Sequence, residues 1–134
     1  MAELDEHAAV ELSLYVENDG DLHRRQGKAI ERNLANKAAL GKYDHKRAVD
    51  LFMYLMESGA KKYAREFATP GEWMHIFSVP TRRAVAENFA LYFETEYRLG
   101  RYDHLLTGVS QKAVLIKART RNELWERAAR LRNA

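Results

Sequence analysis

Two groups of side chains in the sequence have residue types suited to metal or acid–base chemistry. Near the N-terminus, carboxylates cluster in Glu17-Asn18-Asp19-Gly20-Asp21, just before His23. Carboxylate oxygens are the ligands that Mg²⁺ and Ca²⁺ prefer. The cluster lacks the spacing and the final glutamate of an EF-hand loop. We therefore favour a solvated turn that breaks or kinks a helix at 18–20, with Asp21 as the N-cap of the next helix.

The second group is a repeated pentapeptide. Gly41-Lys42-Tyr43-Asp44-His45 returns as Gly100-Arg101-Tyr102-Asp103-His104, and each copy follows a leucine. In the interpretation we favour, each glycine ends a helix in the left-handed conformation and each aspartate caps the next helix. The rival interpretation is that the two Asp-His pairs share a metal ion. Adjacent side chains on a helix point in different directions, which weakens that rival.

No catalytic motif accompanies these groups. The chain has no cysteine, which excludes disulfides and thiolate chemistry. It also lacks Gly-x-Ser-x-Gly, a phosphate-binding glycine-rich loop and His-Glu-x-x-His. The sequence thus names no catalytic residue, no metal ligand and no cofactor. The remaining enzymatic alternative is a metal-dependent enzyme that uses the Asp and His residues of the two groups: Asp19, Asp21, His23, His45 and His104.

Charge is unevenly distributed along the chain. Residues 1–21 hold seven acids and no Lys or Arg, whereas residues 98–134 hold nine bases and three acids. A basic surface can follow a phosphate backbone or bind an acidic protein. It can also pair with the acidic segment of the same chain or of another copy. The basic residues that we select as a binding surface are Arg24, Arg25, Lys28, Arg119, Arg121, Arg127, Arg130 and Arg132.

The last three of these arginines allow a direct test. Arg127, Arg130 and Arg132 fall mostly off the apolar face of the final predicted helix. We expect that neutralising them together weakens partner binding without unfolding the protein. In contrast, Lys61-Lys62 and Arg82-Arg83 are expected to lie on solvated helix faces.

The apolar pattern predicts a mostly α protein, a compact bundle of about five to six helices. A length of 134 residues suits one domain, 1–134, with a core at about 10–106 and a basic C-terminal extension at 107–134. The clearest helix covers 45–67. We expect Phe52, Leu55 and Phe89 to be largely buried.

Two short segments are less clear. Residues 9–16 alternate as a half-buried strand does, although helical spacing is favoured there, and 113–118 reads as a strand or a short helix.

The N-terminal segment is acidic, and no apolar run approaches the ~20 residues that span a bilayer. The expected location is therefore the cytoplasm, with no membrane partner.

Several segments resemble a group of small uncharacterised helical proteins of bacteriophages and their metagenomic relatives. They are Leu14-Tyr15-Val16-Glu17-Asn18-Asp19-Gly20-Asp21-Leu22, Tyr43-Asp44-His45, Ala48-Val49-Asp50-Leu51-Phe52-Met53-Tyr54-Leu55 and Gly59-Ala60-Lys61-Lys62-Tyr63. The resemblance covers about 10–106. It implies a phage-encoded accessory protein in the cytoplasm of a bacterial host, and it carries over no catalytic residue.

Together these observations predict a non-catalytic, phage-type accessory protein. It would bind nucleic acid, or a host nucleoprotein such as a defence complex, through its basic surface, and so act as an inhibitor of host defence. The alternatives are the metal-dependent enzyme above and a structural homo-oligomer.

Overall fold

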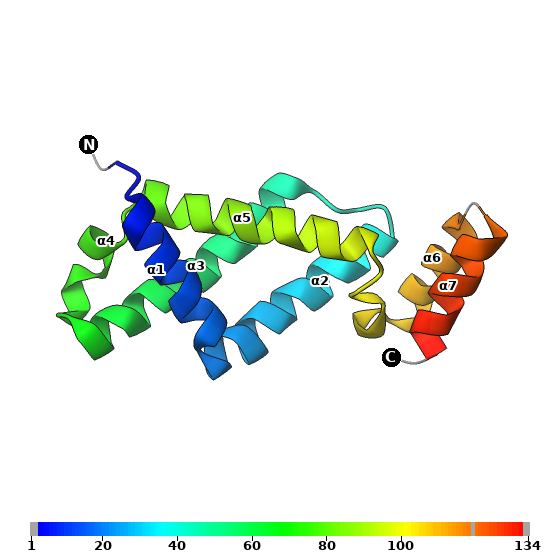
Figure 1. Ribbon diagram of the computed structural model, residues 1–134, viewed down its shortest axis with the longest axis horizontal. Coiled ribbons are helices and arrows are strands. Elements are labelled where there is room, and N and C mark those ends of the chain that lie inside the picture. The colour runs from blue at the N-terminus through cyan, green and yellow to red at the C-terminus, as the bar shows by residue number, and fades with distance from the viewer. Residues whose placement is uncertain (1–2, 119, 133–134) are drawn as a thin grey trace. The chain divides into compact units, whose positions relative to one another are not determined.

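Every regular element in the described part of the chain is helical. The structure is a computed structural model that describes residues 3–118 and 120–132. It contains seven α-helices: α1 (Glu6–Asn18), α2 (Lys28–Ala39), α3 (His45–Phe67), α4 (Trp73–Ile76), α5 (Val79–Arg98), α6 (Gly108–Lys117) and α7 (Arg121–Arg132) (Figure 1). A π-helical segment, η1 (Leu22–Gly27), precedes α2, and 3₁₀ turns lie at η2 (Pro70–Glu72) and η3 (Asp103–Leu105). The mostly α class is confirmed.

The predicted number of helices, five to six, is too low, and the segment at 9–16 is no strand. It lies inside α1, where Leu12 and Val16 are fully buried and Val10 and Leu14 are exposed. The buried pair is four residues apart, which is the spacing of one helix face. The alternation of apolar residues arose because α1 also carries apolar side chains on its exposed side.

The segment at 113–118 is also helical rather than extended. It falls in α6, whose N-cap Thr107 accepts a hydrogen bond at 3.3 Å from the backbone N–H of Ser110. Val114 is buried while Ile116 is exposed, so this short apolar run again has only one side in the core. No strand occurs in residues 3–118 and 120–132.

The predicted helix ends are confirmed. Gly41 and Gly100 have φ of 75° and 74°, the left-handed conformation that glycine adopts without a Cβ penalty. The break before η1 is also present, since α1 ends at Asn18. The prediction of Asp21 as the N-cap is wrong, because its side chain makes no capping hydrogen bond and Asp19 accepts the bond from the Leu22 N–H instead. At the start of α7, the Thr120 hydroxyl accepts a hydrogen bond from the Glu123 N–H at 3.1 Å and so caps the helix.

The chain divides into two compact units. The first contains the residues up to Ala29 together with His45–Leu91, and the second contains Ile30–Asp44 and the chain from Tyr92 onward. Each unit has its own buried side chains. The expectation of a single domain stays a prediction. No helix in the described ranges has both the length and the apolar character needed to cross a membrane.

In the first unit, α1 packs on α3 at a glycine (Figure 1). A Cβ at Gly59 would lie 2.6 Å from Cγ2 of Val16 and 3.5 Å from Cδ1 of Leu12. The two backbones therefore approach as closely as they do because position 59 has no side chain. Phe52 and Leu55 are buried on the same helix, as predicted, whereas Phe89 is only half-buried.

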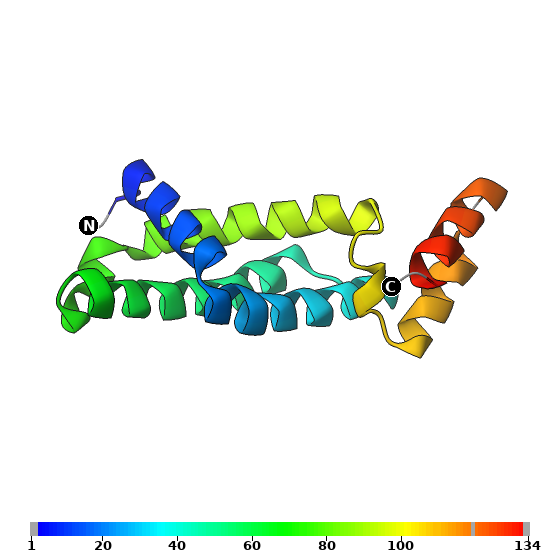
Figure 2. The ribbon, with the colours of Figure 1, turned by 60° about the horizontal axis from the view of Figure 1, so that its bottom comes forward.

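In the second unit, Phe93 is the centre of an aromatic stack. Its ring is nearly parallel to those of Tyr102, Tyr43 and Tyr97, with centroid separations of 5.0, 5.7 and 6.0 Å. The tyrosines of both pentapeptide copies thus pack on one phenylalanine. Near the C-terminus, α6 and α7 run side by side as a hairpin (Figure 2).

The α1–α3 contact leads to a stability prediction. Gly59→Ala should destabilise the protein by about 1–2 kcal/mol. Overpacking a core costs about 1–3 kcal/mol, and the better helix propensity of alanine recovers up to about 1 kcal/mol. Urea unfolding measures the change.

The matched control removes the obstructing methyl groups. In the double variant Gly59→Ala/Val16→Ala, the effect of the Gly59 change should be smaller than in the single variant. A Gly59→Ala protein more stable than its parent would show that α1 does not approach α3 at this point.

Candidate functional site

A basic groove lies between η1 and α3 in the first unit. It has a volume of about 350 Å³. Four cationic side chains line it, against one acidic side chain, that of Asp21. The lining residues are Asp21, Leu22, Arg25, Gln26, Ser58, Lys61, Lys62 and Arg65.

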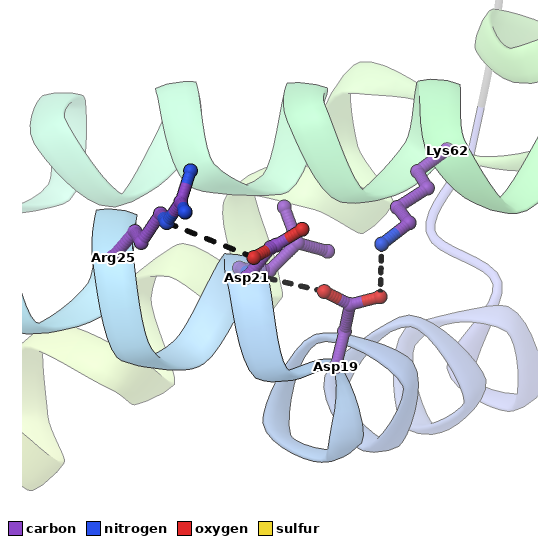
Figure 3. Close-up of polar contacts among 5 residues, drawn as sticks. Asp19, Asp21, Arg25 and Lys62 are labelled. Carbon is purple, nitrogen blue, oxygen red and sulfur yellow. Dashed lines mark hydrogen bonds and ion pairs between the residues drawn. The ribbon is translucent and has the colours of Figure 1, made fainter.

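Asp19 fixes the two walls of this groove relative to each other. One carboxylate oxygen accepts a hydrogen bond from the Leu22 N–H at 3.0 Å, and the other accepts one from Lys62 Nζ at 2.5 Å (Figure 3). The hydrogen bond from Lys62 and that from the Leu22 backbone hold the pKa of Asp19 below its ordinary value. The hydrogen bond between Lys62 and Asp19 also raises the pKa of Lys62. The carboxylate therefore joins the start of η1 to α3.

Two further contacts attach η1 to α3. Gln26 Nε2 donates a hydrogen bond to the Ser58 hydroxyl at 3.2 Å. A Cβ at Gly27 would lie 3.9 Å from Cδ2 of Leu55, so this glycine faces the α3 core. A π-helical segment changes the direction of the side chains that follow it, and such segments are frequent at functional sites. Here η1 places Arg25 beside α3.

Three of the groove cations are accessible to a ligand. Arg25 forms an exposed ion pair with Asp21 at 3.7 Å, and Lys61 pairs with Glu57 on its own helix at 3.1 Å. Exposed pairs of this kind contribute little free energy and exchange readily. The third is Arg65, which is exposed at the far end of the groove. Lys62 differs from these because Asp19 holds it in place.

The groove overlaps the predicted basic surface only in part. Arg24, Arg25 and Lys28 are exposed on η1 and at the start of α2, in the first unit. Lys61-Lys62 was predicted to lie on a solvated face, and Arg65 was not among the predicted binding residues. The α3 part of the groove could have been found in the sequence from its helical spacing. Ser58, Lys61 and Arg65 recur at three- and four-residue steps, which places them on one face of α3.

Two of the predicted C-terminal arginines, Arg127 and Arg130, form ion pairs within the second unit. Asp103 is 1% exposed, and its carboxylate binds Arg127 Nη1 at 2.7 Å and Arg130 Nε at 3.3 Å. Asp103 is therefore not an N-cap but the anchor of α7. Arg127 and Arg130 are therefore not free surface cations but balance a buried charge. We now expect that neutralising them destabilises the fold, contrary to the prediction from the sequence.

The other C-terminal arginines of the predicted binding surface are Arg119, Arg121 and Arg132. Arg121 and Arg132 are exposed, one at each end of α7. Arg119 lies outside the described residues. No residue of α7 is buried, so the ion pairs with Asp103 are a main part of its attachment.

The structure does not gather the Asp and His side chains of the metal alternative. Asp19 is bound by Lys62, and His45 Nε2 lies 3.0 Å from a carboxylate oxygen of Glu87. His23 and His104 are exposed. Across residues 3–118 and 120–132, no three Asp, Glu or His side chains form a group suited to a metal ion.

The Arg82-Arg83 pair is only half solvated, contrary to the prediction. Arg82 is buried and donates a hydrogen bond from Nε to the Phe77 carbonyl at 3.0 Å. Its guanidinium also lies 4.8 Å from the centroid of the Trp73 ring. Burial lowers the pKa of Arg82. This arginine is therefore structural, while Arg83 is exposed.

No family model, curated protein or solved structure matches the chain. The resemblance to bacteriophage proteins and the expected cytoplasmic location stay predictions.

Because Asp103 binds only some of the arginines of α7, replacing Arg127 and replacing Arg132 should have unequal effects on stability. Arg127→Met should cost about 2–3 kcal/mol of unfolding free energy, because it leaves a buried carboxylate with only Arg130. Arg132→Met, at an exposed position, should change stability by less than about 0.5 kcal/mol. Denaturant unfolding and amide exchange of α7 measure both. Equal, small effects would contradict the anchoring role of Asp103.

The Asp19–Lys62 bond predicts a pH-dependent contribution to stability. Because the folded pKa of Asp19 is lowered, the bond stabilises the protein above the ordinary aspartate pKa of about 3.9 and is lost as pH falls through the lowered value. Lys62→Met should therefore melt below the parent at pH 7, and the two melting temperatures should converge in acid. A gap that persists undiminished at the lowest pH at which both proteins fold would contradict this.

Proposed function

We propose that the protein is a non-catalytic binding protein whose partner is nucleic acid, either alone or within a host nucleoprotein such as a defence complex. The observation that carries the proposal is the groove between η1 and α3, where Arg25, Lys61 and Arg65 meet in one compact unit. The bacteriophage context that the sequence resemblance implies, and with it the inhibition of host defence, is part of the proposal.

The chemistry of the groove favours phosphate as the bound group. Lysine offers a compact positive charge, and arginine offers donors matched to phosphate oxygens. Ser58 and Gln26 add neutral polar groups to the lining. Contacts of this kind position a nucleic acid through its backbone and carry little sequence information. Binding should therefore depend strongly on salt and weakly on sequence.

The structure favours this groove over the C-terminal helix as the main contact. On α7, Arg127 and Arg130 are committed to Asp103, and the acids Glu123 and Glu126 lie on the same helix. In the groove, Arg25 pairs with an exposed acid and Arg65 is exposed, while Lys61 pairs with Glu57 and also lies 5.1 Å from the centroid of the Trp73 ring. A phosphate can replace an exposed carboxylate at little cost.

The proposal predicts a change in salt dependence. Parent protein should bind labelled 20-nucleotide strands at low salt, with log Kd rising linearly with log salt. Lys61→Gln/Arg65→Gln should weaken binding and reduce that slope by about 1–1.5, since each lost phosphate contact to a single strand is worth about 0.7. Fluorescence anisotropy over a salt series measures both quantities.

Two control variants sharpen this test. Arg121→Gln/Arg132→Gln removes the same charge from exposed sites on α7 and should leave the slope unchanged. Asp21→Asn removes the acid from the groove lining and should tighten binding. Failure of the parent to bind at low salt, or an equal loss in the α7 control, would refute the groove as the site.

A further inference from the structure

An exposed tyrosine lies in line with the groove cations on α3. Tyr54 is 67% exposed, an unusual position for a large aromatic side chain in the middle of a 23-residue helix. Tyr54, Ser58, Lys61 and Arg65 follow one another at steps of four, three and four residues. At about 100° per residue, these four side chains lie within a sector of about 60° on one face of the helix.

The spacing along this face suits a polynucleotide strand. With a rise of about 1.5 Å per residue, Tyr54 stands about 6 Å from Ser58 and about 16 Å from Arg65 along the helix axis. Tyr54 lies one helical turn beyond Ser58, outside the lining of the groove. A strand that leaves the groove past Ser58 along this face of α3 would therefore reach the Tyr54 ring. This combination of stacking ring and basic groove is the one that proteins use for single strands.

Resting on the proposed function, we propose that the groove binds single-stranded nucleic acid in preference to duplex, and that Tyr54 stacks against an unpaired base. A duplex presents only its backbone to the groove, because its bases are already stacked in the helix interior. A single strand adds the base contact. Asp50 is an exposed acid one turn before Tyr54. A strand that continued past Tyr54 towards the start of α3 would bring its phosphates close to this negative charge, which is unfavourable.

The test compares ring variants on matched probes. Tyr54→Ala should weaken binding of a 20-nucleotide single strand by about 5- to 150-fold, the range of one lost base stack. Tyr54→Phe keeps the ring and should bind as the parent does. Tyr92→Ala removes a similarly exposed tyrosine (63%) from another helix and should also have no effect. DNA and RNA strands are tested in parallel arms.

Two further probes separate stacking from a merely structural effect. An abasic strand keeps the phosphates without bases, so Tyr54→Ala and the parent should bind it equally. A DNA hairpin duplex should likewise be insensitive to Tyr54→Ala. Irradiation of a bound strand that carries 5-iododeoxyuridine should cross-link the base to Tyr54. Mass spectrometry of the digested protein then identifies the cross-linked residue.

Unchanged single-strand binding by Tyr54→Ala, while Lys61→Gln/Arg65→Gln still loses affinity, overturns the role of Tyr54 and leaves the groove proposal standing. Equal losses on single strand, abasic strand and duplex also overturn it. Binding of polyglutamate as tight as that of the single strand would indicate an acidic protein partner instead. No binding of any nucleic acid overturns both proposals.

Discussion

The arrangement of the candidate site depends on the carboxylate of Asp19. Its backbone ends α1, with φ of −87° and ψ of 119°, and so turns the chain toward η1. Its two oxygens then bind the first N–H of η1 and the ammonium of Lys62. Asp19 has a side chain of the type that binds metal ions, but here it connects α1, η1 and α3. The bond to Lys62, together with the Gln26–Ser58 hydrogen bond, attaches η1 to α3 and so places Arg25 beside that helix.

The local parts of the fold were predictable from the sequence. Gly41 and Gly100 take the left-handed conformation, and Thr120 caps α7, because short-range sterics and hydrogen bonding decide these positions. The period of 3.6 identified α3 with its buried Phe52 and Leu55. The segments at 9–16 and 113–118 were ambiguous because apolar side chains on an exposed helix face, such as Val10 and Ile116, imitate the alternation of a strand.

The site was less predictable, because charge pairing depends on contacts between distant residues. Arg127 and Arg130 look like surface cations in a basic segment, yet each reaches a carboxylate more than twenty residues earlier in the chain. Arg82 is likewise buried against Trp73. The π-helical segment η1 has no clear sequence signature. Only after these arginines are placed does the basic face of α3 stand out, with Tyr54 exposed on the same stripe.

We propose that the groove between η1 and α3 contacts nucleic acid. The most direct measurement is a titration of ¹⁵N-labelled protein with a single-stranded 20-mer at low salt, followed by amide chemical shifts. We expect the largest changes in η1 and along α3, around Arg25, Ser58, Lys61 and Arg65, with α7 nearly unchanged. Changes confined to α7, or none at saturating oligonucleotide, would contradict it.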